Sequence, residues 1–355
     1  MNAKKLSALL LAVVMIFSLA ACGSKTPKTD PNATRIFTDS TGREVEVPAQ
    51  IDKVALSGPL AQIVLFALCP DKLVGVSNAW SSEAQEFLDE KYFNMPQIGQ
   101  LYGGKGELNL ETLLQSGAQV VIDVGESKGS IKEDMDSLQQ QTGIPFVHIS
   151  ADMQSYPQAY RMLGDLLGMK TEAEALATYC EKIYSRTETI ASGVEKANVL
   201  YVTGDMGQNV IAKGAYHAEI LDMLTNNLAQ VDEPSSKGTG NEVSMEQILT
   251  WNPDVVIFAP ESIYATVKDD AAWQSVTAIK NGAYYEVPFG PYNWMGFPPS
   301  VQRYLGMVWL SKLLYPDATA DYDLFADVQE YYKLFYHCDI TRAQYDALVA
   351  NSIGK

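Results

Sequence analysis

The chain has 355 residues, with 43 acidic side chains against 26 basic ones and a formal net charge of −17. This acidity argues against a nucleic-acid partner, because no basic stripe is present to displace counterions from phosphates. The cysteines are widely scattered, without a CxxC pair or a Cys/His cluster, which argues against a disulfide framework or a structural zinc site.

The first residues predict export and a lipid anchor. Two lysines precede an apolar run over residues 6–20, which has signal-peptide length and is too short for a comfortable membrane span. The run ends on the letters LAAC, and two small residues before a cysteine resemble a bacterial lipobox, in which the Cys22 thiol receives diacylglycerol. An ordinary signal peptide followed by a chance cysteine is the alternative. We expect residues 1–21 to be the signal peptide and the polar residues 22–34 to be a flexible tether.

Beyond the tether, short apolar strands alternate with segments of helical periodicity, which predicts parallel sheets covered by helices. The expected strands of the first half are VALSG (54–58), LVGVS (73–77), QVVIDV (119–124) and FVHIS (146–150). After residue 197 the order starts again, with NVLYV (198–202), a helix near 215–228, VVIFA (255–259) and YYEVP (284–288). We therefore expect an α/β protein with two Rossmann-like lobes, each built on a parallel sheet.

A long helical segment separates the two halves. Gly168 is expected to end one helix, and Thr171 with Glu174 has the spacing of a capping box for the next. An apolar stripe of helical period then continues from Ala173 to Ile190. Such a helix would be roughly 36 Å long at 1.5 Å per residue, enough to join two lobes rigidly. The predicted organisation is an N-terminal lobe (35–170), a connecting helix (171–195), a C-terminal lobe (196–315) and C-terminal helices (316–355).

One phrase occurs twice, as LETLLQSGAQVVI (110–122) and MEQILTWNPDVVI (245–257). Each copy has a glutamate, then aliphatic residues on one helical face, then the start of a strand. The glutamates are Glu111 and Glu246, and in both copies the final isoleucine follows the glutamate by 11 residues. The helix macrodipole favours an acid in the first turn, which is the plain structural explanation. Identical spacing in two copies points instead to a shared role at the surface.

The lipobox, the tether, two α/β lobes and one joining helix together resemble the cobalamin- and ferric-siderophore-binding proteins of ABC importers, which are class III periplasmic binding proteins. The resemblance covers nearly all of residues 35–355, and its most specific parts are the two glutamate phrases. It implies that Glu111 and Glu246 dock on a permease dimer, where arginines of the two transmembrane subunits receive them. We expect a monomer anchored on the outer face of the membrane, and the lipobox and acidic tether favour a Gram-positive surface over a Gram-negative periplasm.

In two-lobe α/β proteins, ligands lie where loops leave the carboxyl ends of the strands and the lobes face each other. Broad aromatic surfaces there suit flat or chelate-like ligands such as a corrinoid, haem or an iron complex. Tyr292 and Trp294 are assigned to this cleft because a turn rich in Pro and Gly is a poor place to bury rings. The full set of candidate ligand-binding residues is Ser57, Trp80, Tyr102, Lys105, Met206, Tyr216, His217, Tyr292, Trp294 and Met295.

For several of these residues, a purely structural role is the alternative to ligand binding. Trp80 can merely cap its lobe. The GGK at 103–105 is too short for a Walker phosphate loop, so Lys105 either meets an anionic ligand or lies in solvent. Tyr216 and His217 have atoms that can ligate a metal, but a lone His beside a Tyr is more often structural. We expect no metal held by protein atoms and no cofactor, the ligand itself being the metal chelate.

An enzyme is the main alternative class, but we expect no GxSxG nucleophile elbow and no nucleophile–base pair, and the sequence has no HExxH and no dinucleotide GxGxxG motif. Receptors for bare manganese or zinc use several histidines, whereas the three of this chain, at 148, 217 and 337, are scattered. An oxyanion such as molybdate stays open as a ligand, as does a lipid-anchored sensor or adhesin on the same scaffold. The prediction is a lipid-anchored solute-binding receptor, not an enzyme, that delivers an iron complex or a corrinoid to an ABC permease dimer.

Overall fold

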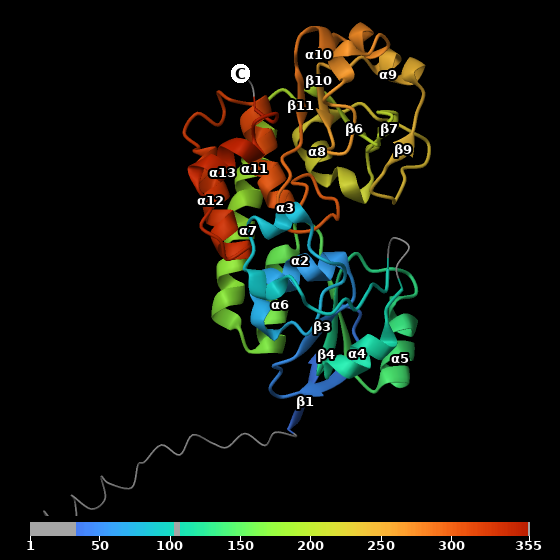
Figure 1. The fold of residues 1–355 in the computed structure, drawn as a ribbon, viewed down its shortest axis with the longest axis vertical. Helices are drawn as coiled ribbons and strands as arrows, with labels where there is room; N and C mark the ends of the chain where they lie inside the picture. The colour runs from blue at the N-terminus through green and yellow to red at the C-terminus, as the bar shows by residue number, and fades with distance from the viewer. Residues whose placement is uncertain (1–32, 103–106, 354–355) are drawn as a thin grey trace, which may run out of the picture.

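The computed structural model describes residues 33–102 and 107–353, which form two α/β lobes joined along one side by helices (Figure 1). The N-terminal lobe opens with an antiparallel hairpin of β1 (Thr34–Thr38) and β2 (Glu44–Pro48). Its main sheet is parallel, in the order β3-β4-β5. These strands are β3 (Val54–Leu56), β4 (Val120–Gly125) and β5 (Phe146–Ser150). β4 is buried along its whole length, as expected of a central parallel strand covered on both faces.

The segment 73–77 is not the strand that we predicted. It forms only single bridges, from Leu73 to Val54 and from Val76 to Gln97. Gly75 separates the two bridges, and a glycine weakens a strand because it has no side chain to pack. The helices of this lobe are α2 (Pro59–Leu68), α3 (Ser82–Gln85), α4 (Leu110–Ser116), α5 (Ile131–Thr142) and α6 (Tyr156–Leu167), with 3-10 turns at Pro70–Lys72 and Glu90–Tyr92.

The joining helix is α7 (Lys170–Gly193), which has 24 residues. Gly168 ends α6 as predicted, with a left-handed φ of 69° that glycine adopts without strain. The predicted capping box is wrong, because α7 begins before Thr171. Its cap residue is Met169, whose side chain makes no capping hydrogen bond. Glu174 instead pairs with an arginine of α6, at 2.7 Å, which ties the two helices together.

The C-terminal lobe contains a six-stranded mixed sheet in the order β11-β10-β6-β7-β9, with β8 beside β6. β6, β8, β10 and β11 run parallel, whereas β7 pairs antiparallel with β6 on one side and with β9 on the other. The strands are β6 (Asn198–Thr203), β7 (Asn209–Val210), β8 (Asn226–Asn227), β9 (Asn241–Glu242), β10 (Val255–Phe258) and β11 (Tyr284–Glu286). The helices are α8 (Glu219–Leu224), α9 (Met245–Trp251) and α10 (Thr277–Lys280), with 3-10 turns at Tyr216–Ala218, Val267–Asp269 and Trp273–Ser275.

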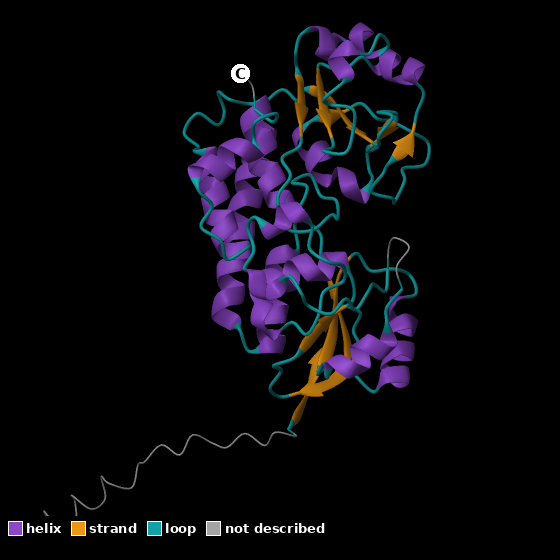
Figure 2. Cartoon of the chain, viewed as in Figure 1, coloured by secondary structure: helices purple, strands orange, loops and turns teal. Residues whose placement is uncertain are grey.

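The chain closes with α11 (Arg303–Leu314), α12 (Leu324–Phe335) and α13 (Arg342–Leu348). α11 packs on α7, and α12 reaches back to α2 of the N-terminal lobe. Figure 2 shows α7, α11 and α12 gathered along one side of both sheets. One buried apolar cluster runs through these helices and into both lobes. The lobes are therefore held by a packed helical spine, which favours small relative movements over a wide hinge.

Candidate functional site

Loops of the two lobes meet where the strands of both sheets end. The Tyr216 hydroxyl of the C-terminal lobe donates to the carbonyl of Ala151, just after β5, at 3.1 Å. The Tyr304 hydroxyl of α11 donates to the carbonyl of Met153 at 2.7 Å. Ligands of α/β proteins bind beyond the carboxyl ends of the strands, so these facing loops are the candidate site.

Tyr216 and His217 form the C-terminal side of this site. His217 is 8% exposed, and its Nδ1 lies 3.3 Å from the carbonyl oxygen of Gly296. Burial lowers the pKa of His217 below its ordinary value of 6.5, and the positive charges of Arg303 and Lys128 act in the same direction. Lys128 belongs to the other lobe, after β4. The imidazole is therefore neutral at pH 7, and its Nδ1 is held by a backbone carbonyl.

Behind these two residues lies a buried ion pair that the sequence analysis did not identify. Arg303, at the start of α11, is 0% exposed, and its Nη1 lies 2.5 Å from Oε2 of Glu219 on α8. Nη1 also donates to the Tyr216 carbonyl at 2.9 Å, and the guanidinium stands 4.8 Å from the Tyr216 ring centroid. Nε and Nη2 have no hydrogen-bond partner among the described atoms. The sequence feature that could have revealed this pair was a single arginine at the start of the apolar run RYLGMVWL.

The N-terminal side of the site is a polar cluster at the ends of β4 and β5. Nδ1 of the buried His148 lies 2.6 Å from a carboxylate oxygen of Asp123, and the Ser57 hydroxyl donates to the other oxygen. His148 Nε2 lies 2.9 Å from Ser127 Oγ and 3.2 Å from Ser150 Oγ. Ser57 is therefore committed to a buried carboxylate, whereas Ser127 is exposed at the lobe boundary.

The same cluster contains a motif that the sequence analysis missed. Residues 125–129 read GESKG, the GxSxG spacing of serine hydrolases, and they lie between β4 and α5 with Ser127 linked through the histidine to the aspartate. The strained serine of a nucleophile elbow is missing, since the non-glycine residues with positive φ in the described ranges are Asn252 and His337. Ser127, His148 and Asp123 are therefore linked in series within the N-terminal lobe, without the backbone conformation of a nucleophile elbow.

Three residues that the sequence assigned to the cleft lie in the core instead. Trp80 is 6% exposed, and its indole Nε1 donates to a backbone carbonyl at 2.9 Å. Trp294 and Met295 are 0% and 1% exposed. The turn rich in Pro and Gly does bury a ring, because it packs closely on α11: a Cβ added to Gly306 would lie 2.4 Å from the Trp294 carbonyl oxygen. In this conformation the three side chains offer no surface to a ligand.

Two predicted tyrosines contribute hydroxyl groups near the lobe boundary. Tyr292 is partly buried and accepts a hydrogen bond from Nε2 of Gln62, in the other lobe, at 3.3 Å. Tyr102 donates to Oδ2 of Asp134 at 2.6 Å. Burial raises the pKa of both tyrosines, and for Tyr102 the hydrogen bond to the carboxylate adds to the effect. Both hydroxyl groups are therefore protonated at neutral pH.

Two large apolar side chains are left exposed on strand-end loops of the C-terminal lobe. Met206, which was predicted, is 72% exposed, and Phe297, which was not, is 50% exposed. The residue before Phe297 is Gly296, whose carbonyl oxygen contacts Nδ1 of His217. Phe297 could have been predicted from the sequence because it closely follows Tyr292 and Trp294, which were already assigned to the cleft. The two other predicted residues, Lys105 and Cys22, lie outside the residues that the structure describes.

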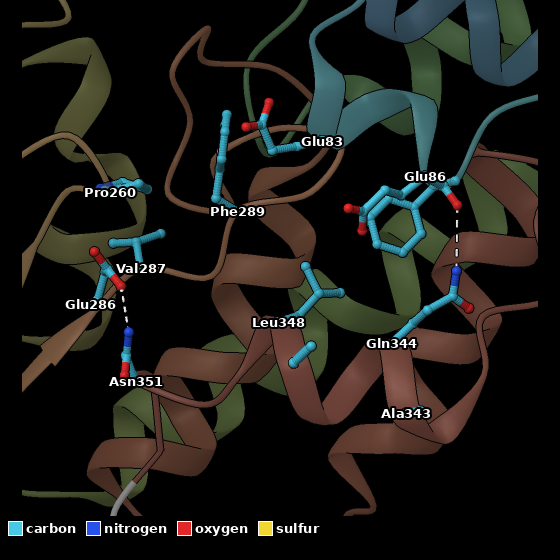
Figure 3. Close-up of a pocket in the computed structure, with 12 residues that line it drawn as sticks. Glu83, Glu86, Pro260, Glu286, Val287, Phe289, Ala343, Gln344, Leu348 and Asn351 are labelled. Atoms are coloured by element: carbon cyan, nitrogen blue, oxygen red, sulfur yellow. Dashed lines mark hydrogen bonds between the residues drawn. The ribbon is translucent and has the colours of Figure 1, made fainter.

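A separate hollow of about 550 Å³ lies where α3, the end of β11 and α13 meet (Figure 3). Its walls are apolar and acidic, with Phe289 and Leu348 beside Glu83 and Glu286. Glu286 accepts a hydrogen bond from Nδ2 of Asn351 at 2.9 Å. None of the residues predicted to bind ligand lines this hollow. We therefore place the candidate site at the facing loops.

The two repeated glutamates stand on matching helices. Glu111 and Glu246 are exposed, in the first turns of α4 and α9. Asn109 caps α4 and Ser244 caps α9, each by accepting a backbone N–H with its side-chain oxygen. In Figure 1 both helices lie on the side of the molecule away from α7 and α12. Each lobe therefore presents one carboxylate to solvent on this side.

Cysteines and acidic side chains do not gather into a further site within the described ranges, where no cluster of three or more His, Cys, Asp or Glu residues could hold a metal ion. Burial raises the pKa of Cys69 to about 12, and that of Cys180 is raised for the same reason, so both thiols stay protonated. No helix of these ranges combines the length and the apolar character needed to cross a bilayer.

Comparison with known proteins places this geometry among solute binders. A sequence profile described as periplasmic binding protein matches residues 54–290. The molybdate-binding protein MolA from Haemophilus influenzae is 24% identical over 348 residues, which cover 90% of this chain and 95% of that protein. An ABC transporter solute binding protein from Sulfurospirillum deleyianum has a TM-score of 0.81 at 26% identity, covering 89% of this chain and 99% of that one. The catecholate-siderophore binding protein VctP from Vibrio cholerae has a TM-score of 0.56 at 17% identity, covering 78% and 99%.

Proposed function

The chain belongs to the periplasmic binding protein family, and on that premise we propose that it captures an iron complex, namely a ferric siderophore or haem, or a corrinoid. It is an ABC transporter solute-binding protein, and such proteins deliver small ligands to a permease from the periplasmic or extracellular side. The family binds solutes and is not a family of enzymes. The proposed part is therefore the chemistry of the ligand and the residues that hold it.

The observation that carries the proposal is the pair of exposed apolar side chains on the strand-end loops, Met206 and Phe297. A large organic ligand can cover a thioether and a phenyl ring at once, whereas a bare ion cannot. Full burial of each side chain contributes about 1.5–3 kcal/mol, enough to make these two contacts a substantial part of binding. Flat or chelate-like ligands have the apolar faces that such a surface requires.

A second candidate ligand is an oxyanion such as molybdate. It is supported by the similarity to MolA, whose name describes molybdate binding. Arg303 adds a physical reason, since two of its guanidinium nitrogens lack partners and its charge is balanced by Glu219. An oxyanion that reached this arginine would compete with Glu219 for it. The two candidates differ in whether the exposed apolar side chains contribute to affinity.

A thermal-shift series separates the two candidates. Haem, cobalamin, a ferric hydroxamate, a ferric catecholate and molybdate are each added to the wild-type protein and to a Met206→Ser, Phe297→Ser variant. A ligand at about 100 times its Kd stabilises the native state by about 2.7 kcal/mol, which raises the melting temperature measurably. We expect one of the chelates to raise it in the wild type and to do so less in the variant. A rise with molybdate alone, equal in both proteins, contradicts the chelate proposal and supports the oxyanion.

We also propose that Glu111 and Glu246 are the carboxylates that dock on the two permease subunits. A pair related by approximate twofold symmetry suits a dimeric permease, and Arg–carboxylate pairs fix register because they are directional. The variant Glu111→Lys, Glu246→Lys is expected to abolish uptake while ligand affinity stays within about twofold of the wild type. Glu172→Lys, in the first turn of α7, is the matched control for a reversed helix-start charge. Normal uptake by the double variant would refute the docking proposal.

For the N-terminus we propose that Cys22 carries the lipid anchor and that the mature protein is a monomer on the cell surface. Cys22→Ala should release the receptor into the medium, and size-exclusion chromatography with light scattering measures its mass. A receptor still bound to membranes after this substitution would refute the anchor. If the anchored protein binds its ligand but deletion of its gene leaves uptake unchanged, the sensor or adhesin alternative gains support.

A further inference from the structure

The two repeated helices share more than a glutamate. Leu114 on α4 is 52% exposed and Leu249 on α9 is 39% exposed. Each leucine follows the glutamate of its own helix, Glu111 or Glu246, by three residues. The described residues contain six exposed large apolar side chains, so two of the six occupy the same position of a repeated phrase. The same exposed pair therefore occurs once in each lobe.

The local structure explains why both leucines point outward. The residues just before them, Leu113 and Ile248, are 0% exposed and anchor the helices to the two lobes. Adjacent residues of a helix are about 100° apart, so the next side chain leaves the buried face. Residues three apart lie on one face, which puts each leucine beside its glutamate. Each lobe therefore presents an acid and an aliphatic side chain together.

We propose that the two pairs, Glu111 with Leu114 and Glu246 with Leu249, form two equivalent composite contacts for one partner, the permease dimer. The proposal rests on the proposed importer function and adds a chemical requirement to it. Each permease subunit must offer an apolar socket beside its cationic group. A symmetric dimer provides that combination twice, on the same side of the receptor where α4 and α9 lie in Figure 1.

The two parts of each contact do different work. An exposed carboxylate that meets a cation adds little affinity in water and mainly sets orientation and on-rate. An aliphatic side chain that becomes buried contributes affinity, since apolar area is removed from water. With one leucine on each lobe, apolar contacts can hold the receptor on the permease after the carboxylates have oriented it. The four other exposed apolar residues are not placed on a repeated helix: Ile36 lies on the β1–β2 hairpin, Ile353 near the C-terminus, and Met206 and Phe297 on loops of the candidate site.

Binding to the permease reconstituted in nanodiscs tests the proposal without any knowledge of the ligand. The receptor variants are Leu114→Ser with Leu249→Ser, the conservative pair Leu114→Met with Leu249→Met, and the control Ile36→Ser. We expect the serine pair to weaken binding by about tenfold or more at low and at high salt, mainly through a faster off-rate. The methionine pair should retain affinity within about threefold, and Ile36→Ser should leave it unchanged. Melting temperatures of the three variants verify that each is folded.

The charge-reversed variant Glu111→Lys, Glu246→Lys is measured in parallel. It distinguishes a failure of the composite contact from a failure of the docking role itself. If it abolishes docking while the serine pair binds like the wild type, the composite contact is wrong and the importer function stands. If neither pair of substitutions affects docking, the docking role of both helices is wrong. If the wild type self-associates through the leucines and the serine pair is monomeric with unchanged permease affinity, the occupant is a second copy of this chain, which overturns the proposal.

Discussion

Removing one partner of the buried Arg303–Glu219 pair should have a strongly asymmetric effect on stability. Glu219→Leu leaves a guanidinium that is 0% exposed with the Tyr216 carbonyl as its one hydrogen-bond acceptor among the described residues. Breaking a buried pair in this way costs about 3–5 kcal/mol. Glu219 keeps 29% of its side chain exposed although its Oε2 is buried, so Arg303→Met leaves one oxygen without its partner on a side chain that stays partly hydrated. We expect that variant to lose about 1–3 kcal/mol.

Differential scanning calorimetry at neutral pH measures this asymmetry. At roughly 2 °C per kcal/mol for a chain of this size, Glu219→Leu should lower the melting temperature by about 6–10 °C. The double variant Glu219→Leu, Arg303→Met should recover most of that loss, because it removes the uncompensated charge. Burial alone would lower the pKa of Arg303, but in the wild type the negative charge of Glu219 reverses this and holds the pKa above its ordinary value. Glu219→Leu is the one variant that retains the arginine, and it removes this support for the buried charge. Equal losses for the two single variants, or no recovery in the double variant, would refute the reasoning.

Three further substitutions test the surroundings of the site. The pKa of His217 is lowered in the folded state, so the unfolded chain binds the proton more tightly and stability should fall as the pH drops below about 6.5. His217→Gln should make the melting temperature depend less on pH over that range. An unchanged pH profile would contradict the lowered pKa of His217. Tyr216→Phe removes the hydrogen bond to Ala151, and hydrogen exchange should speed up at the facing loops with little change in global stability. Gly306→Ala forces a methyl group toward the Trp294 carbonyl and should destabilise the protein by about 1–3 kcal/mol in chemical denaturation, whereas a neutral result would show that α11 can shift.

Much of the fold could be read from the sequence because its signals are local. The strands that begin at residues 54, 120, 146, 198, 255 and 284 are short apolar runs, and the apolar stripe of α7 repeats with helical period. The repeated phrase predicted two lobes with matching helices, and α4 and α9 begin at the first residues of the two phrases, Leu110 and Met245. The end of α6 at Gly168 followed from glycine's tolerance of a left-handed backbone.

The site was predicted less well than the fold, because local sequence patterns do not show which loop side chains are buried. Trp294 is buried because a helix that begins nine residues later packs on its backbone, and no local signal contains that contact. Arg303 and Glu219 are 84 residues apart and meet only when α8 and α11 pack together. The GESKG motif at 125–129 is local and was simply missed, whereas its link to His148 could not be read locally because the histidine lies on a different strand.

The sequence by itself determined the two α/β lobes, the helix between them and the exposed glutamates, because backbone periodicity and helix capping depend on neighbours a few residues away. Only the tertiary structure decided which aromatic rings fill the core, which charges are buried as a pair and which leucines stay in water. Those outcomes depend on contacts between segments distant along the chain, whose burial energies are set by packing and not by local pattern.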